Sequence, residues 1–319
     1  MTERGDRPIG PVDATEVPRF AGLATFARLP LLERLERCDV AVAGVPFDAG
    51  TTFRPGARFG PSAVRQISRL LRTYDPALDV EPFGVQQVAD AGDLVGTPFD
   101  VPGAIRQIEA GADELFSRAS HLVTIGGDHT ISLPLLRAVR RRFGPVALVH
   151  FDAHLDTWDT YFGAPYTHGT PFRRAFEEGL LVEDASIHVG IRSSTYAKSD
   201  YADDEGFGFR VVRAAELDTI GVEGVLERIR ARVGSSAVYV SIDVDVLDPA
   251  HAPGTGTPEA GGLSSRELLS ILAGMRDLDV VSADVVEVSP AYDHAEITSI
   301  AAAHLAYTLI GLMPTARGS

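Results

Sequence analysis

The chain has 319 residues, 45% of them hydrophobic, a formal net charge of −15 and a single cysteine. The large negative charge opposes binding to nucleic acid and to anionic membranes, and it favours the approach of a cationic substrate. The one cysteine, Cys38, excludes a disulfide framework within the chain. We therefore expect a buried thiol in a reducing compartment, the cytoplasm.

The start of the chain differs from the rest. Residues 1–20 carry charges and prolines but no apolar segment of the kind found in secretory signals. We expect residues 1–35 to form an N-terminal arm, ordered or frayed, and residues 36–319 to form a single domain. The longest apolar stretch, 297–313, is interrupted by polar residues and falls short of a membrane span, so it predicts a core helix.

Strands alternate with helices along the predicted domain. Eight short apolar runs predict strands at 38–47, 86–92, 122–127, 146–151, 186–191, 209–214, 237–242 and 280–288. Between them lie helical patterns such as 222–233 and 101–119, the latter with Asp100 as N-cap and Pro102 in its first turn. Because the strands are almost continuously apolar, we expect a parallel sheet covered by helices on both faces. Eight such units are compatible with a closed barrel or with an open sheet.

Acids and histidines follow four of these strands. The segments are GGDH at 126–129, DAHLD at 152–156, DVD at 243–245 and EVSP at 287–290. Alternate residues of an extended chain point the same way, so these side chains converge at the sheet edge where parallel α/β proteins bind ligands. Six of them form a candidate set of metal ligands: His129, Asp152, His154, Asp156, Asp243 and Asp245.

The composition of this set indicates the metal. Six ligands, four of them carboxylates, exceed what one four-coordinate zinc uses, and an oxygen-rich set favours Mn²⁺. We predict two Mn²⁺ ions per chain, which would bind and deprotonate one bridging water. A single Asp after a strand is usually a turn residue or a helix cap, but a buried cluster of unpaired charges is too costly for that interpretation.

Long stretches around these residues resemble the signature motifs of the ureohydrolase family, which includes arginases, agmatinases and guanidinobutyrases. The motifs are GGDHT, HFDAHLDTWDT, THGTPF, SIDVDVLDPAHAPGTGTPEAGGL and DVVEVSPAYDHAEIT. The resemblance runs from residue 50 to the C-terminal helix. It implies an arginase-like fold, an open three-layer α-β-α sandwich around a mostly parallel eight-stranded sheet, with 36–319 as the catalytic domain. It also implies a homo-oligomer, a trimer or hexamer.

The same resemblance implies roles for individual residues. One Mn²⁺ would be held by His129, Asp152, Asp156 and Asp243, and the other by His154, Asp152, Asp243 and Asp245. Asp152 and Asp243 would bridge the two ions. His168 matches the histidine proposed to shuttle protons, and Glu287 matches the carboxylate that binds the guanidinium of the substrate; Asp156 is counted with them as catalytic.

Both His168 and Glu287 also make chemical sense. A guanidinium is a planar cation with a fork of donors, for which a carboxylate is the natural partner. The amine that leaves must be protonated, a step suited to an imidazole that titrates near neutral pH. The plainer interpretations are a loop histidine bonded to the backbone for His168 and a salt bridge with an arginine for Glu287.

The substrate is predicted from one departure from arginases. Arginases carry an Asn two positions after the last Asp of the DAHLD motif, where this chain has Trp158. Trp158 offers an apolar or cation–π surface to an ammonium tail, so we expect hydrolysis of agmatine to putrescine and urea. Arg173 and Arg174 could instead contact the carboxylate of 4-guanidinobutyrate. Other guanidino acids and guanidino secondary metabolites are further alternatives.

Two hypotheses come from other classes of protein. The first is a non-catalytic binding protein on the same fold, which intact His168 and Glu287 oppose. The second is a zinc deacylase with one metal in an Asp-His-Asp set, which has no use for the second ligand group. Arg54 and Arg58, in GTTFRPGARFGP, either position substrate, lock a loop, contact another subunit or are simply solvated.

Overall fold

A computed structural model describes residues 7–313, which form an eight-stranded, all-parallel sheet in the order β2-β1-β3-β8-β7-β4-β5-β6. The strands are β1 (Cys38–Val45), β2 (Val88–Asp93), β3 (Ala119–Gly126), β4 (Ala147–Phe151), β5 (Ser186–Ile191), β6 (Phe209–Arg213), β7 (Val238–Asp243) and β8 (Val280–Val286). Strands β4, β7 and β8 are buried along their whole length and β3 everywhere but at Ser120, so both faces of the sheet must be covered.

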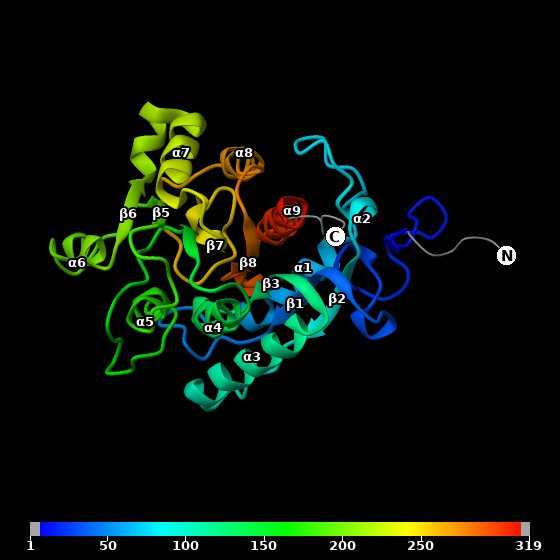
Figure 1. The fold of residues 1–319 in the computed structure, drawn as a ribbon, viewed down its shortest axis with the longest axis horizontal. Helices are drawn as coiled ribbons and strands as arrows, with labels where there is room; N and C mark the ends of the chain where they lie inside the picture. Colours follow the sequence, from blue (N-terminus) through cyan, green and yellow to red (C-terminus); the bar gives the residue numbers. More distant parts are fainter. Residues whose placement is uncertain (1–6, 314–319) are drawn as a thin grey trace.

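Helices cover the two faces. They are α1 (Gly60–Ser68), α2 (Pro82–Val85), α3 (Val101–Phe116), α4 (Ser132–Phe143), α5 (Pro171–Glu177), α6 (Asp200–Gly206), α7 (Leu217–Val233), α8 (Ser265–Gly274) and α9 (Ile297–Leu312). Figure 1 shows α7, α8, α9 and α1 on one face and α3, α4 and α5 on the other. The edge strands β2 and β6 do not pair with each other. The sheet is therefore open, and the predicted three-layer α-β-α sandwich is confirmed.

Element boundaries differ slightly from the prediction. Strand β3 begins three residues early, at Ala119, because Cys38 of β1 pairs with it across the sheet. Helix α7 begins at Leu217 and passes through Gly221, whose φ of 64° interrupts the helical pattern. Asp100 is the N-cap of α3, although its side chain makes no capping bond. Among residues 7–313 no helix is both long and apolar enough to cross a membrane.

The part of residues 7–37 that precedes β1 lies along the β2 edge of the sheet (Figure 1). Phe26 is fully buried there, and its backbone N–H donates to the Asp90 carboxylate at 2.6 Å. Arg65 of α1 donates to the same carboxylate, at 2.9 Å from Nε. The Asp90 carboxylate of β2 therefore links the segment around Phe26, through a hydrogen bond, to helix α1, through an ion pair with Arg65.

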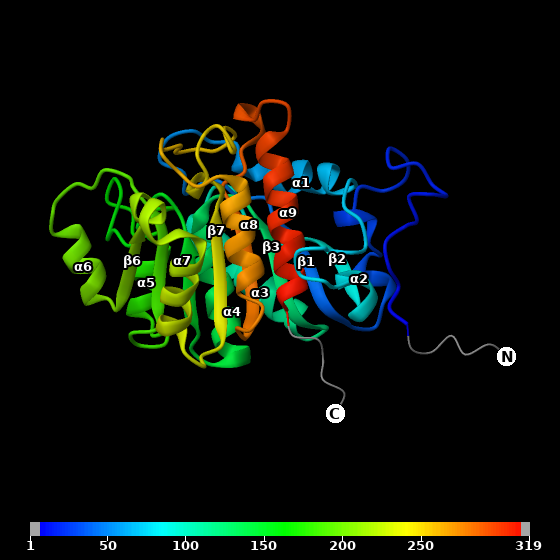
Figure 2. The same ribbon diagram turned by 90° about the horizontal axis from the view of Figure 1, so that it is seen from above.

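The sheet order explains where side chains gather. Strands β3, β8, β7 and β4 are consecutive neighbours, and all four point the same way. Their carboxyl ends meet the loops that crowd one end of the molecule in Figure 2. The four acidic and histidine segments follow these four strands. One edge of the sheet therefore collects them, as parallel α/β folds do at their ligand sites.

Candidate metal centre and active site

The six predicted ligands lie together at this edge. Nδ1 of His129, the first residue of the short helix η4 (His129–Ile131), is 3.2 Å from Asp152 Oδ2, 2.9 Å from Asp156 Oδ2 and 3.5 Å from Asp243 Oδ2. These four residues match the first predicted ligand set.

The second set forms around His154. Its Nδ1 is 3.2 Å from Asp152 Oδ1 and 3.1 Å from Asp245 Oδ2. Asp152 thus offers one oxygen to each group, which is the position of a bridging carboxylate. The geometry groups Asp152, His154 and Asp245 as one possible metal-binding cluster and His129, His150, Asp152 and Asp156 as another. His150 was not among the six ligands predicted from the sequence.

Short-range hydrogen bonds hold these carboxylates. Asp152 Oδ1 accepts from the backbone N–H of His154 at 2.6 Å, and Asp243 Oδ1 accepts from that of Asp245 at 2.8 Å. A carboxylate that bonds the backbone two residues on is the Asx-turn favoured by Asp. Asp156 adopts a left-handed φ of 54°, which turns its side chain back toward His129. In both motifs, the first Asp therefore fixes the backbone two residues later, where the next candidate ligand lies.

The electrostatics of the cluster call for a cation. Burial raises the pKa of the Asp243 carboxyl well above its usual range, and the neighbouring Asp245 and Asp152 charges raise it further. Burial also raises the pKa of Asp156, again with help from Asp152. Buried like charges at these distances are unfavourable unless a cation neutralises them. Divalent metal ions would do so.

The tautomer of His129 also fits a metal. The Ser241 hydroxyl donates to Asp284 Oδ1 at 2.6 Å, so its oxygen must accept from His129 Nε2, 2.8 Å away. The hydrogen of a neutral His129 therefore sits on Nε2 and leaves a lone pair on Nδ1. That atom is buried and faces the carboxylates of Asp152, Asp156 and Asp243. Fixing a ligand histidine in this way through an outer carboxylate is typical of metal sites.

His168 and Glu287 form a buried pair beside the cluster. His168 Nδ1 lies 2.9 Å from Glu287 Oε1, and its Nε2 lies 2.7 Å from the hydroxyl oxygen of Thr52, which can accept from the protonated ring. Burial opposes protonation, but the Glu287 carboxylate raises the pKa of His168 to about 9. Glu287 has a left-handed φ of 67°, and its Oε2 atom is buried with no hydrogen-bond partner within residues 7–313. In the same part of the chain no arginine pairs with Glu287, so the alternative interpretation of this residue, a salt bridge with an arginine, does not hold.

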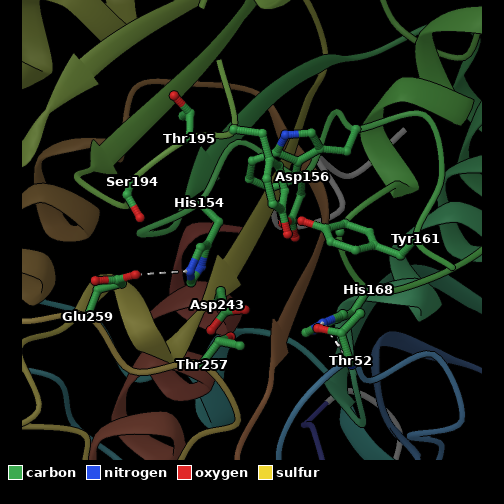
Figure 3. A pocket seen from close by; sticks show the side chains of 13 residues that line it. Thr52, His154, Asp156, Tyr161, His168, Ser194, Thr195, Asp243, Thr257 and Glu259 are labelled. Atoms are coloured by element: carbon green, nitrogen blue, oxygen red, sulfur yellow. Dashed lines mark hydrogen bonds and ion pairs between the residues drawn. The ribbon is translucent and has the colours of Figure 1, made fainter. Parts of the chain in front are cut away.

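A cavity of about 270 Å³ opens above both groups (Figure 3). Its wall includes Thr52, His154, Asp156, Trp158, Tyr161, His168, Tyr196, Asp243, Thr257 and Glu259. Trp158, Tyr161 and Tyr196 pack edge to face with ring centroids about 6 Å apart, at 5.9, 6.0 and 6.1 Å. The Trp158 indole N–H lies 3.4 Å from the Asp200 carboxylate.

Acidic groups rather than basic ones surround this cavity. Glu259 Oε1 is 3.9 Å from His154 Nε2 at the wall. Apart from the two histidines, the described chain gives the cavity no cationic side chain. Tyr196 and Glu259 were not predicted from the sequence as site residues. Tyr196 comes from a loop outside the recognised motifs, whereas Glu259 lies within the motif at 241–263.

The arginines considered for substrate binding are occupied elsewhere. Arg174 Nη2 donates to Asp159 Oδ1 at 2.6 Å, and Arg173 Nε donates to Glu177 at 2.9 Å. Neither lines the cavity. Arg58 pairs with Asp48, whose carboxylate also accepts from the Gly56 N–H at 2.8 Å, so it locks its loop. Arg54 packs its guanidinium over the rings of Phe53 and Tyr292, at 5.3 and 5.1 Å.

Known proteins resemble this chain over most of its length. A family model described as the Arginase family matches residues 38–311. The guanidinopropionase of Pseudomonas aeruginosa is 46% identical, over 95% of this chain and 95% of its own. The mitochondrial agmatinase of Gallus gallus is 41% identical, over 95% of this chain and 89% of its own. The structure of proclavaminate amidino hydrolase from Streptomyces clavuligerus superposes with a TM-score of 0.88 at 44% identity, covering 93% of this chain and 98% of that one.

Proposed function

The chain belongs to the arginase family of ureohydrolases, and from this membership we propose that it hydrolyses agmatine to putrescine and urea. Amidinohydrolysis of a guanidino compound is the activity that the family supports. The choice of agmatine rests on one observation, the cavity wall. It joins an aromatic cluster to carboxylates and lacks lysine and arginine among residues 7–313. Such a wall favours an ammonium tail over a carboxylate tail.

The proposed metals are two Mn²⁺ ions. One would be held by His129, Asp152, Asp156 and Asp243 and the other by His154, Asp152, Asp243 and Asp245, an oxygen-rich set of ligands. Short distances join His129 to the three carboxylates of the first set, and join His154 to Asp152 and Asp245 in the second. Bound there, the pair would supply Lewis acidity and an activated water.

The residues around the cavity divide the remaining work. The unpartnered Oε2 of Glu287 would accept from the guanidinium, whose planar fork suits a carboxylate. His168 would hold a proton on its imidazole and pass it to the departing amine, since Glu287 keeps that ring protonated at neutral pH. Asp156 lines the cavity and would orient the attacking water through its carboxylate.

A guanidino acid, such as 4-guanidinobutyrate, is the alternative substrate. It is favoured by the 46% identity to a guanidinopropionase, which is no lower than the identity to an agmatinase. Arg173 and Arg174 do not support it, because their guanidiniums are paired with acidic side chains outside the cavity. We further propose that residues 36–319 act as one catalytic domain, in a cytoplasmic homo-oligomer.

Urea release from a panel of compounds tests the proposal. The Mn²⁺-loaded protein should give a higher kcat/KM with agmatine than with arginine, 4-guanidinobutyrate or 3-guanidinopropionate. Asp243→Asn, which should hold no metal, serves as the inactive control. A guanidino acid ahead of agmatine would refute the substrate assignment, and no urea from any guanidino compound would refute the activity.

A further inference from the structure

A chain of buried polar groups leads from the metal centre away from the cavity. His150 of β4 places Nε2 2.9 Å from Asp152 Oδ2 and Nδ1 2.6 Å from His188 Nδ1. The two histidines are direct neighbours in the register of β4 and β5. Beyond them, His188 Nε2 lies 3.3 Å from Asp204 Oδ1 of α6, and the Thr157 hydroxyl donates to that oxygen at 2.8 Å.

These groups are sealed from solvent. His150, Asp152, His188 and Asp204 each have an exposed fraction of 0%. Buried polar groups in proteins are usually paired. Within residues 7–313 the Asp204 carboxylate has no ion pair with a lysine or an arginine. Within residues 7–313 the only ion-pair partner of Asp204 is His188.

Donor and acceptor rules set the direction of the chain. An ionised carboxylate only accepts, so His150 must direct an Nε2–H at Asp152. A neutral His150 then presents a lone pair at Nδ1, which must accept from an Nδ1–H of His188. The remaining atom, His188 Nε2, faces the Asp204 carboxylate. His188 Nε2 is buried and makes no hydrogen bond within residues 7–313, so its contact with the Asp204 carboxylate at 3.3 Å is electrostatic.

We propose that His150, His188 and Asp204 are positioning residues for Asp152, so that metal affinity depends on α6, a helix that contains none of the predicted ligands. Asp152 contributes one oxygen to each metal group, and Oδ2 is the oxygen shared with His129. A hydrogen bond to that oxygen fixes the plane of the carboxylate between the two groups. Outer hydrogen bonds of this kind commonly change metal affinity by roughly 10–100-fold.

The inference rests on the proposed metal centre, but its test needs no substrate. Isothermal titration of the metal-free protein with Mn²⁺ gives the affinity directly. Asp204→Asn should bind Mn²⁺ roughly 10–100-fold more weakly than the wild type. Asp203→Asn, a charge-matched change at an exposed site of the same helix, should bind as the wild type does. Equal affinity of the wild type and Asp204→Asn would overturn the proposal.

A second pair of variants separates support from direct ligation. The Nε2 amide of a glutamine can donate to Asp152 as the imidazole Nε2 does, but the nitrogen of an amide has no lone pair free to bind a metal as an imidazole nitrogen does. His150→Gln should therefore keep most of the Mn²⁺ affinity that His150→Ala loses. Equal losses in the two variants would show that His150 is itself a ligand and would overturn the positioning role.

A third variant protects the test against misfolding. If Asp204→Asn does not fold, His188→Phe breaks the same link in a site that already packs against Phe209, with ring centroids 4.4 Å apart. It should weaken Mn²⁺ binding, and wild-type affinity would again overturn the proposal. A wild type that binds Mn²⁺ but releases no urea would refute the proposed reaction. The Mn²⁺ affinities of the variants, compared with that of the wild type, would still test the positioning role of His150, His188 and Asp204.

Discussion

Replacing Glu287 by Gln should lower the pKa of His168 from about 9 to near its ordinary 6.5. The Glu287 carboxylate is the main group that overcomes the burial of this ring, and it lies 2.9 Å from Nδ1. The difference between the two values corresponds to roughly 3 kcal/mol of interaction between the imidazolium and its surroundings. The Asp156 and Asp128 carboxylates still favour the charged ring, so the pKa should not fall far below the ordinary value.

The sign of the stability effect follows from the same shift. A pKa raised on folding contributes stability that is complete below pH 6.5 and is lost as the pH rises through about 9. The free energy of unfolding of the wild type should therefore exceed that of Glu287→Gln most at pH 6 and least at pH 9.5.

Histidine NMR on the metal-free proteins would measure the pKa, with His168→Asn to assign the resonance. Glu183→Gln, at an exposed site, is the matched control and should leave it unchanged. A His168 that still titrates near pH 9 in Glu287→Gln would refute the reasoning.

Three further predictions concern catalysis, metal binding and specificity. His168→Asn should slow urea release by ~10²-fold or more with unchanged metal content, and wild-type turnover from pH 7 to 10 would show that the ring is structural. Ser241→Ala removes the acceptor for His129 Nε2–H and should weaken Mn²⁺ binding by about tenfold in calorimetry; an unchanged affinity would contradict the tautomer argument. Trp158→Ala should raise the KM for agmatine by about fivefold, the size of a cation–π contact of ~1 kcal/mol, with a smaller effect on 4-guanidinobutyrate. A larger effect on the acid would argue against an ammonium tail at this wall.

The metal-ligand candidates could be predicted from the sequence because each follows a buried strand. Asp152, His154 and Asp156 are two residues apart, and so are Asp243 and Asp245, but an extended backbone is not what brings them together. Asp245 lies in the short helix η6 (Val244–Val246), and Asp156 has a left-handed φ of 54°. The ligand candidates that follow β3, β4 and β7 can lie together only if these strands are close in one sheet. The observed order β3-β8-β7-β4 confirms that they are. The predicted strand boundaries were accurate to a few residues because the apolar runs in the sequence are the segments that the sheet buries.

The site residues that could not be predicted from the sequence are those placed near the metal centre by the pairing of strands. His150 was within reach of sequence reasoning, since it lies two residues before Asp152 on the same side of β4. His188 was not, because only the pairing of β4 with β5 places it against His150. Tyr196 reaches Trp158 for the same reason, from the loop after β5. Their sequence neighbourhoods carry no chemical motif, so pairing alone makes them part of the site.

Helix α6 is where these unpredicted contacts meet. Asp204 ends the polar chain that begins at Asp152, and Asp200, four residues earlier, accepts from the Trp158 indole at the cavity wall. Thr157, adjacent to both Asp156 and Trp158, donates to Asp204. The segment that carries Asp156 and the aromatic wall is thus held by the helix that also supports the bridging carboxylate. Asp204→Asn in α6 should therefore alter metal affinity and tail selectivity together, whereas Ser241→Ala in β7 should alter metal affinity alone.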